Sequence, residues 1–343
     1  MTGTTQPSLA IFSAPFYPMV GGMERYAEDL AGGLTVLGYR VELVTSTPAN
    51  GADDSRFNFT VTRVSSRWEF MKILLRHKRV LFVGMSSYEV LLASVMRRSI
   101  LLTHHGPYVV YGNANGHLKG AVKRRIAQCF PGICVSHYLA GWFQHRHPVI
   151  HNAYRDDLFA AAPAASRAAG SFAFVGRLVS EKGVGVLVRS FARLHARHPD
   201  VRLTIVGDGP EREALVALAQ ELGCREAVTF MGSQPAEAIA ALLATQCCLV
   251  APSLGFESFG IVALEGLAAG CEVVVSQRGG MSEAVGDYGW VVEPEEDALY
   301  AAMCAIQTGL GRCNDPGVAQ FLRHHSRVEV ARQYAEALAH LLS

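Results

Sequence analysis

Short apolar runs alternate with longer amphipathic segments along most of the chain. Ser8–Pro15, Arg40–Thr47 and Ser99–His105 are short, apolar and rich in branched residues, which is typical of buried strands. Between the first two, Gly21–Tyr39 has helical spacing and a stop signal at Gly38. Repetition of strand, helix and strand predicts βαβ units, and therefore an α/β fold with a parallel, doubly wound sheet.

A second set of such units follows a break in the pattern. Ala161–Gly170 is built of small residues, contains proline and lacks periodicity, which predicts a linker. Strands then recur from "SFAFVGRL" to "CEVVVSQ", with helices such as Glu211–Gly223 between them. Pro148–Ala153 reads as one more short strand before the break. We predict an N-terminal Rossmann-like domain over residues 1–160, a linker over 161–170, a C-terminal domain over 171–322 and a C-terminal helix over 323–343 that packs back on the N-terminal domain.

Two such domains joined by one linker predict a central cleft. In doubly wound sheets, ligands bind at the carboxyl ends of the strands, near the point where the strand order reverses. Residues that directly follow strands are therefore the first candidates for function.

Composition supports a packed interior and gives no sign of a membrane span. Half of the residues are hydrophobic and 18% are charged, which argues against disorder. No apolar run reaches the ~18 residues that a span needs, and we expect no secretory signal. The eight cysteines show no CxxC repeat, and Cys247 and Cys248 lie inside an apolar run. We interpret them as reduced core residues of a cytoplasmic protein.

The charges are distributed unevenly between the two halves. Residues 1–155 hold 17 Lys and Arg against 8 Asp and Glu, whereas residues 156–343 hold 14 against 22. A basic half is typical of a protein with an anionic partner, such as a membrane surface, a nucleic acid or an acidic substrate. A general solubility bias is the alternative interpretation.

The segment "GFESFGIVALEGLAAG" holds Glu257 and Glu265 with seven residues between them. It resembles the E-x7-E motif of retaining glycosyltransferases of family 4, which have the two-domain GT-B fold. "GGMERY", "THHG", "VIHNAYRDDLF", "FVGRLVSEKG", "IVGDGPE", "FMGSQP" and "GGMSEAV" also resemble family motifs and occur in the family's order. The resemblance therefore spans nearly the whole chain and implies a nucleotide-sugar donor.

A nucleotide-sugar donor loses its diphosphate as the leaving group, and fixed positive charge must stabilise it. Arg177 and Lys182 follow the predicted strand "SFAFVG", and we assign both to the diphosphate. Ordinary surface charges beside a turn are the alternative.

The two glutamates flank the start of a predicted helix near Ser258 or Phe259. The free amides of Ser258–Ile261, with Gly260 allowing close approach, predict an anion site. Eight residues of helix would place Glu265 on nearly the same face as Glu257, about 12 Å along the axis. The resemblance implies that Glu257 contacts the donor sugar and Glu265 the ribose hydroxyls. A pair of buried, salt-bridged glutamates is the alternative.

Further candidates lie at other strand ends. His105 precedes Gly106, and the resemblance implies that it contacts the donor sugar at the reaction centre, while His104 points the other way. The amides of Gly21 and Gly22 open a helix that could approach the phosphates. The resemblance also places the backbone of Gln234 near the base. The catalytic candidates are His105, Glu257, Arg177 and Lys182. The donor-binding candidates are Gly21, Gly22, Arg177, Lys182, Gln234, Glu257, Ser258, Phe259, Gly260, Ile261 and Glu265.

No metal or other cofactor is expected. The chain has no DxD-like triad at a strand end, which is typical of metal-independent GT-B enzymes. We interpret the histidines between residues 137 and 151 as a polar surface: His137, His145, His147 and His151. The chain departs from the family at Cys247 or Cys248, where an Asp is usual, and at Ala153, where Asn152 would usually be followed by Gly.

Together these features predict a retaining glycosyltransferase of the hexosyltransferase type. It would use a UDP- or GDP-sugar in bacterial cell-surface glycan or glycolipid assembly, and nucleic acid is not an expected partner. Glycosylation of a soluble natural product, a GT-B nucleotide-sugar epimerase and a non-catalytic glycan-binding protein are the alternatives.

Basic residues with aromatic neighbours at Arg67–Arg79, and a second basic cluster at His117–Arg125, predict peripheral contact with an anionic membrane. Packing of the apolar residues of Arg67–Arg79 on the sheet is the alternative.

Overall fold

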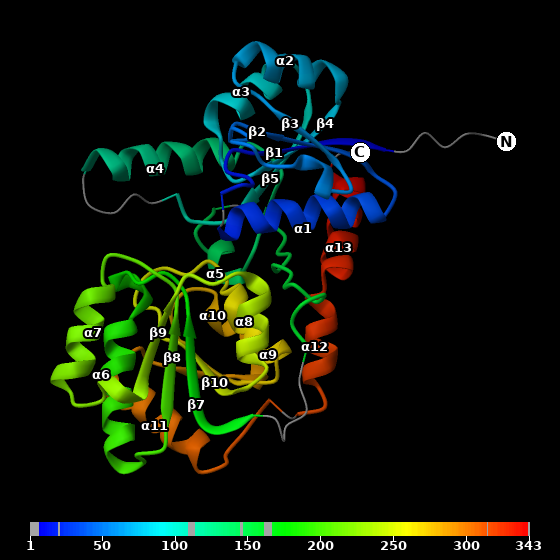
Figure 1. The fold of residues 1–343 in the computed structure, drawn as a ribbon. Helices are drawn as coiled ribbons and strands as arrows, with labels where there is room; N and C mark the ends of the chain where they lie inside the picture. The colour runs from blue at the N-terminus through cyan, green and yellow to red at the C-terminus, as the bar shows by residue number, and fades with distance from the viewer. Residues whose placement is uncertain are drawn as a thin grey trace. The chain divides into compact units, whose positions relative to one another are not determined.

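The computed structural model describes residues 7–19, 21–108, 114–144, 147–160, 167–313 and 315–341. The chain forms two compact units (Figure 1). Unit 1 comprises the chain up to Ala153 together with residues from Arg327 onward, and unit 2 comprises Tyr154–Ser326.

Unit 1 is built on a parallel sheet whose described strands pair in the order β3-β2-β1-β4-β5-β6. The strands are β1 (Ser8–Ser13), β2 (Arg40–Thr45), β3 (Thr60–Arg63), β4 (Arg79–Val83), β5 (Ser99–His104) and β6 (Gly132–Cys134). The helices are α1 (Gly22–Val36), α2 (Arg67–Arg76), α3 (Ser87–Val95), α4 (Ala114–Ala127), α5 (His137–Ala140) and α13 (Arg327–Leu341).

The C-terminal helix α13 completes the core of unit 1 by packing on α1. Gly33 of α1 makes this close approach possible, since a Cβ there would lie 2.6 Å from the Cβ of Ala331. Tyr334 of α13 is fully buried in the same core as Tyr26 and Leu30 of α1. Residues near the end of the chain therefore help to support the sheet of unit 1.

Unit 2 repeats the architecture with a parallel sheet of order β12-β11-β10-β7-β8-β9. Its strands are β7 (Ala168–Val175), β8 (Arg202–Val206), β9 (Val228–Gly232), β10 (Gln246–Ala251), β11 (Glu272–Ser276) and β12 (Trp290–Val292). Its helices are α6 (Val184–Arg197), α7 (Arg212–Glu221), α8 (Ala236–Leu243), α9 (Ile261–Ala268), α10 (Met281–Val285), α11 (Glu296–Gln307) and α12 (Val318–His324). Figure 1 shows helices on both sides of this sheet.

Helix α6 shows how the sequence pattern produces this packing. Its buried residues Val184, Leu187, Phe191 and Leu194 recur at helical spacing and form one apolar face. That face lies in one core with residues of β7, such as Phe172. The same pattern of buried strand and one-sided helix accounts for the predicted α/β class.

Both sheets reverse their strand order at their first strand. β1 lies between β2 and β4, and β7 lies between β8 and β10. All of these pairs are parallel, so the predicted doubly wound architecture is confirmed in each unit. The loops after β1 and β4, and those after β7 and β10, flank the two switch points at which such sheets bind ligands.

The structure corrects several element boundaries. Ala168–Gly170, expected within the linker, belong to β7, where Gly170 has a φ of 72°. The register between β7 and β10 shifts at this end, so a strand continues through residues that lack a strand-like pattern. The rest of that linker, residues 161–166, lies outside the described residues. Pro148–Ala153 forms only one bridge, between Val149 and Cys134, rather than a strand.

The helices are short compared with a bilayer. Within the described ranges, none combines the length and apolar character needed to cross a membrane.

Candidate functional site

The loops after β7 and β10 meet at the switch point of unit 2. Gly183, after β7, has a φ of 68°, and a Cβ there would overlap the carbonyl oxygen of Pro252, after β10. The amides of Leu254 and Gly255 donate hydrogen bonds to the carbonyl oxygen of Glu181 at 2.8 and 3.0 Å. Backbone contacts without intervening side chains therefore fix the two loops against each other.

This arrangement brings Lys182 and Glu257 together. The Lys182 ammonium group forms an ion pair with the Glu257 carboxylate. Their side chains keep 27% and 23% of their exposure, so both reach solvent. The pair places one cation and one anion, both partly exposed, at the switch point of unit 2.

The loop after β11 closes the other side of Glu257. The amide of Gly280 donates a hydrogen bond to the Glu257 carbonyl oxygen at 2.9 Å. Gly279 has a φ of 72°, and a Cβ there would overlap the same carbonyl oxygen. The backbone of Glu257 is thus held by the loop after β11.

Arg177 follows β7 at the same edge of the sheet. Its side chain is exposed and, within the described residues, has no ion-pair partner. The chain beside it is held tightly, because a Cβ at Gly207, after β8, would overlap the Gly176 carbonyl oxygen. The structure therefore brings Arg177 and Lys182 to one sheet edge, with Lys182 paired and Arg177 available.

The helix after Glu257 begins later than expected. α9 starts at Ile261, preceded by Gly260 with a φ of 99°, so Ser258 and Phe259 lie in the loop. The prediction that the helix begins at Ser258 or Phe259 is wrong, because the left-handed turn at Gly260 interrupts the backbone there. Phe259 is buried in this loop. The free amides of the first turn are those of Ile261 and Val262, since the Ala263 amide donates a hydrogen bond to the Gly260 carbonyl oxygen at 2.9 Å.

Glu265 lies on α9 and is 6% exposed. Because Glu257 precedes the helix across the Gly260 turn, the prediction that both share one helical face is wrong.

Gln234 follows β9 and is half-buried; its side-chain amide donates a hydrogen bond to the Met231 carbonyl oxygen at 2.8 Å. This hydrogen bond involves only the side chain of Gln234. The contact with the base that the resemblance implies would involve its backbone instead.

In unit 1, His105 directly follows β5 and is half-buried. Its Nε2 lies 2.9 Å from the Thr103 hydroxyl, and its ring contacts that of Tyr26 edge-on at 4.3 Å. Burial lowers the pKa of His105 to about 3. The imidazole is therefore neutral at physiological pH and suited to hydrogen bonding rather than to carrying charge.

His104 occupies a different environment, as the alternation along the strand predicts. Its side chain is fully buried, with Nδ1 2.9 Å from the Tyr108 hydroxyl and its ring 4.8 Å from that of His147. Burial lowers its pKa to about 3. A Cβ at Gly132 would overlap its Nε2, so His104 packs on the β6 backbone as a core residue.

Gly21 and Gly22 stand at the start of α1, as predicted. α1 begins at Gly22, and Gly21 is extended with a φ of −167°. A Cβ at Gly22 would meet nothing within 4 Å, so its backbone is accessible from outside. Glu24 lies in the first turn of the same helix, which places an anion beside the amides expected to meet phosphate.

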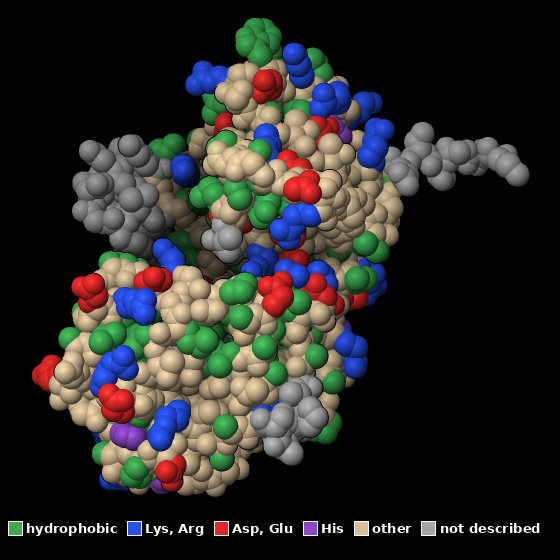
Figure 2. All heavy atoms as spheres, in the orientation of Figure 1, with side chains coloured by type: hydrophobic (Ala, Val, Ile, Leu, Met, Phe, Trp, Pro, Cys, Tyr) green, Lys and Arg blue, Asp and Glu red, His purple; other side chains and the backbone are tan. Residues whose placement is uncertain are grey.

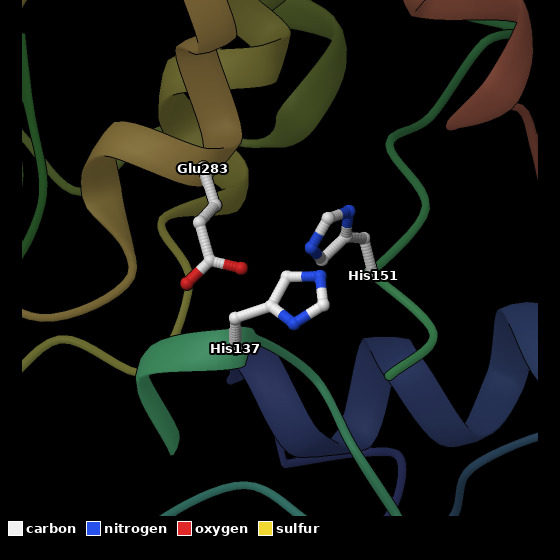
Figure 3. Close-up of side chains that lie close together, drawn as sticks. All are labelled: His137, His151 and Glu283. Atoms are coloured by element: carbon white, nitrogen blue, oxygen red, sulfur yellow. The ribbon is translucent and has the colours of Figure 1, made fainter. Parts of the chain in front are cut away.

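Two of the four histidines expected on a polar surface lie together. His137 begins α5 and His151 lies in the following loop; their rings are 5.8 Å apart and edge-on. Figure 3 shows the two imidazoles side by side, and also labels Glu283 of α10 in unit 2. His145 lies outside the described residues. His147 contacts buried His104 instead of lying on a surface, so that part of the prediction is wrong.

All eight cysteines are free thiols. Cys248 and Cys271 are buried in unit 2, and burial raises the pKa of the Cys271 thiol to about 12. Cys129 is exposed, so the expectation that the cysteines are core residues fails at this position.

Most of unit 2 matches a known protein family. Residues 167–306 match the profile of the family described as "Glycosyl transferases group 1", so this part of the chain is a glycosyltransferase group 1 domain. A protein of Methanocaldococcus jannaschii named an uncharacterized glycosyltransferase is 34% identical over 166 residues, which are 47% of this chain and 40% of that protein. A D-inositol 3-phosphate glycosyltransferase of Acidothermus cellulolyticus is 37% identical over 190 residues, 48% of this chain and 41% of that protein. The chain thus matches well under half the length of each relative.

A solved structure extends the likeness to the whole fold. HepE of Anabaena, crystallised in complex with UDP and glucose, superimposes with a TM-score of 0.79 at 19% sequence identity. The match covers 97% of this chain and all of that one. The expected fold class, α/β of the GT-B kind, is confirmed.

The charged and histidine candidates were predictable from the sequence, whereas the residues that contact and position them were not. The contacts of Gly279 and Gly280 with Glu257 involve backbone atoms, which leave little signal beyond the glycines themselves. Thr103 and Tyr26 lie against His105, and only the alternation of β5 indicates that Thr103 shares its face.

Proposed function

We propose that this protein is a retaining glycosyltransferase of the hexosyltransferase type that transfers a sugar from a UDP- or GDP-sugar to an acceptor hydroxyl. The observation that carries the proposal is the placement of Lys182, Glu257 and Arg177 at the switch point of unit 2. Within a glycosyltransferase group 1 domain, this is the edge at which doubly wound sheets bind nucleotides.

The cations support departure of the diphosphate. Negative charge grows on the leaving phosphate as the glycosidic bond breaks, and preorganised cations lower the energy of that state. Arg177 offers a planar fork of donors to phosphate oxygens, while Lys182 offers a compact charge. The free amides of Ile261 and Val262 add the positive end of the α9 dipole.

The glutamates would hold the sugar parts of the donor. When phosphate oxygens attract Lys182, the Glu257 carboxylate is released to accept hydrogen bonds from sugar hydroxyls. Glu265 would accept hydrogen bonds from the ribose. His105, neutral and half-buried, would hydrogen-bond the transferred sugar in the same step. Gln234 would meet the base through its backbone, and Gly21 and Gly22 would meet the phosphates through their amides.

A donor panel tests this function. Purified protein is incubated with UDP-, GDP- and ADP-sugars and candidate acceptors, and products are followed by mass spectrometry. Transfer with retained anomeric configuration, shown by NMR of the product, is the expected result. Epimerised donor without acceptor would instead indicate an epimerase, and binding without any product would indicate a glycan-binding protein.

No metal is needed in this proposal, because Arg177, Lys182 and helix amides supply the positive charge. EDTA should leave turnover unchanged. If turnover fell with EDTA and returned with a divalent cation, the metal-independent mechanism would be wrong. A His137→Ala variant would then show whether the His137 and His151 pair holds the metal.

For the acceptor, we propose a lipid-linked glycan at an anionic membrane. In α2, Trp68 and Leu75 are 72% and 67% exposed. They are seven residues, or two turns, apart and so lie on the same face of the helix, with exposed Lys72 between them. Neighbouring α3 adds Leu91 and Val95, which are 47% and 81% exposed. Figure 2 shows hydrophobic side chains beside Lys and Arg on this part of unit 1. Exposed apolar side chains beside basic ones are typical of a surface that binds at the membrane–water interface.

The structure also corrects the residues of this surface. Phe70, Ile73 and Leu74 are buried, so half of the apolar residues of Arg67–Arg79 pack in the core. Arg76 is paired with Glu42 and is less available to a membrane. In the second basic cluster, Lys123 and Arg125 are exposed, whereas the side chains of residues 117–119 lie outside the description.

Vesicle co-sedimentation tests the membrane contact. The protein should bind vesicles that contain phosphatidylglycerol, bind neutral vesicles less, and lose binding with salt. A Trp68→Ser/Leu75→Ser variant should bind at least tenfold more weakly, whereas Val36→Ser, an equally exposed apolar residue of α1, should not. Absence of binding at low salt would favour a soluble acceptor such as a natural product.

A further inference from the structure

Phe259 lies in the turn of residues 257–260, between Glu257 and the start of α9, and its side chain is buried. Its ring stacks on the imidazole of His325, which directly follows α12. The ring centroids are 6.0 Å apart, and the ring planes differ by 22°. Because α9 and α12 also pack on each other, the turn that carries Glu257 is joined to the end of α12 by an aromatic contact.

His325 is held by both its side chain and its backbone. Its Nδ1 lies 2.9 Å from the carbonyl oxygen of Phe321, and Nδ1 is the donor because a carbonyl oxygen can only accept. The His325 amide donates to the Leu322 carbonyl oxygen at 3.0 Å. Its carbonyl oxygen accepts from the Tyr154 amide at 3.2 Å. The imidazole is therefore fixed to the last turn of α12 and offers a fixed face to Phe259.

Further aromatic rings continue this contact away from the turn. The Phe321 ring lies 4.5 Å from the His325 ring and 5.4 Å from the ring of Tyr288. A Cβ at Gly286 would lie 3.0 Å from the Phe321 ring, so the lack of a side chain there makes room for it. The rings from Phe259 to Tyr288 thus form a continuous row of contacts within unit 2.

Backbone contacts hold the two ends of the 257–260 turn. At one end, the Gly280 amide donates to the Glu257 carbonyl oxygen. At the other, a Cβ at Gly260 would overlap the sulfur of buried Met281 of α10, so the chain passes close against that helix. The Phe259 ring holds the middle of the turn, and its position depends on the ring on which it stacks.

We propose that His325 is a positioning residue that acts through Phe259, and that their stacked rings hold the turn that carries Glu257. The part of this contact in sugar transfer rests on the proposed function, whereas its effect on the turn does not. His325 directly precedes Ser326, the last residue of unit 2, and its carbonyl oxygen is bound to Tyr154, the first. The turn is therefore tied to the place where the chain enters and leaves unit 2.

Hydrogen exchange of the protein without donor, followed by NMR, tests the contact. His325→Asn keeps a side-chain donor for the Phe321 carbonyl and removes the ring, whereas His325→Phe keeps a ring and removes the donor. The Gly280 amide should exchange about tenfold faster in His325→Asn, the effect of losing one aromatic contact, and at the wild-type rate in His325→Phe. Any other pattern would overturn the proposal. The amide of Val250 in β10 should be unchanged in both, which shows that unit 2 stays folded.

Phe259→Leu tests whether His325 acts through Phe259. This variant keeps the site apolar and removes the stacked ring, so it should also speed exchange of the Gly280 amide. Adding His325→Asn to it should then have little further effect, since both changes remove the same contact. Additive effects of the two changes would overturn the route through Phe259.

A second stack of the same kind provides the matched control. His195, in the last turn of α6, stacks on Phe191 with the same centroid distance of 6.0 Å, at the end of α6 opposite Gly183. His195→Asn should change neither exchange of the Gly280 amide nor turnover. Faster exchange of this amide in His195→Asn would show that it reports general loosening of unit 2 and would overturn the assignment to His325.

Turnover separates the role in transfer from the role in the turn. With the preferred donor, His325→Asn should lower kcat/KM about tenfold, mainly through kcat because Glu257 is assigned to the reacting sugar, and His325→Phe should restore it. Faster exchange with unchanged kcat/KM would overturn the role in transfer. If the wild type turned over no donor, the proposed function would fail, and the exchange rates would still decide whether His325 holds the turn.

Discussion

Lys182 and Glu257 form an ion pair across the switch point of unit 2, although 75 residues of chain separate them. The pair keeps the two charges compensated when no ligand is bound. On the proposed function, the cation and the anion would each exchange partners when a nucleotide sugar binds. The donor would supply both new partners, phosphate oxygens for Lys182 and sugar hydroxyls for Glu257.

Removal of the cations should slow the proposed transfer. Lys182→Ala and Arg177→Ala should each lower kcat by about 100-fold or more, because loss of one preorganised charge contact costs about 3–4 kcal/mol of transition-state stabilisation. Steady-state assays with the preferred donor measure this. Arg193→Ala, which removes an exposed arginine of α6 paired with Asp297, is the control and should keep its rate. Near-normal rates in folded Lys182 and Arg177 variants would refute the diphosphate assignment.

The two glutamates should differ in the kinetic step that they affect. Glu257→Gln should lower kcat most, because its partner is the sugar that changes charge during transfer. Glu265→Gln should chiefly weaken donor binding, since the ribose does not change charge in the reaction. Steady-state kinetics and calorimetric titration with the nucleotide separate these effects. Reversed effects would contradict the assigned roles.

The sequence pattern was sufficient for the sheets and the charged residues of the candidate site. Buried strands such as β7 and one-sided helices such as α6 have periodicities that depend on local residues alone. Arg177, Lys182 and Glu257 lie in the loops that follow β7 and β10, so the topology by itself brings them to one edge. The pairing of Lys182 with Glu257 was not predictable, because it depends on how the two loops pack.

Errors arose where one backbone angle or a distant contact decides the structure. Gly260 was expected to allow approach of a ligand, but its left-handed conformation also delays the start of α9 to Ile261. His147 was expected at the surface because its neighbours are polar, yet its ring packs on that of His104. The short strands β3 and β12 were missed because each has only three or four residues and little apolar pattern.

Glu272 should contribute strongly to the stability of unit 2. Its carboxylate is buried at the start of β11 and accepts hydrogen bonds from the backbone amides of Arg312 and Cys313 and from the Trp290 indole at 2.8–3.1 Å. Glu272→Ala would leave these donors without their acceptor. We expect a loss of about 3 kcal/mol in the free energy of unfolding, measured by urea denaturation. Glu293→Ala, which removes an exposed partner of Arg278, should cost less than about 0.5 kcal/mol.

Acid should destabilise unit 1 partly through Glu42. Its carboxylate contacts His77 Nε2, the Thr62 hydroxyl and the Arg76 guanidinium at 2.7, 2.7 and 2.5 Å. The hydrogen bond from His77 is the largest of the causes that lower the pKa of Glu42 from 4.5 to about 2. Because the folded state holds this carboxylate in its charged form, its contribution to stability is present above about pH 4.5 and is lost as the pH falls toward 2.

Glu42→Gln tests that linkage. The variant should lose about 1–2 kcal/mol at pH 7, a discounted value because the Arg76 partner is exposed. Between pH 4.5 and pH 2.5 its stability should fall less steeply than that of the wild type, since it has no proton to take up at this position. Urea denaturation across this range gives both slopes, and Glu336→Gln, which changes an exposed carboxylate of α13, is the control. Parallel slopes for wild type and Glu42→Gln would show that acid acts on the protein through other groups.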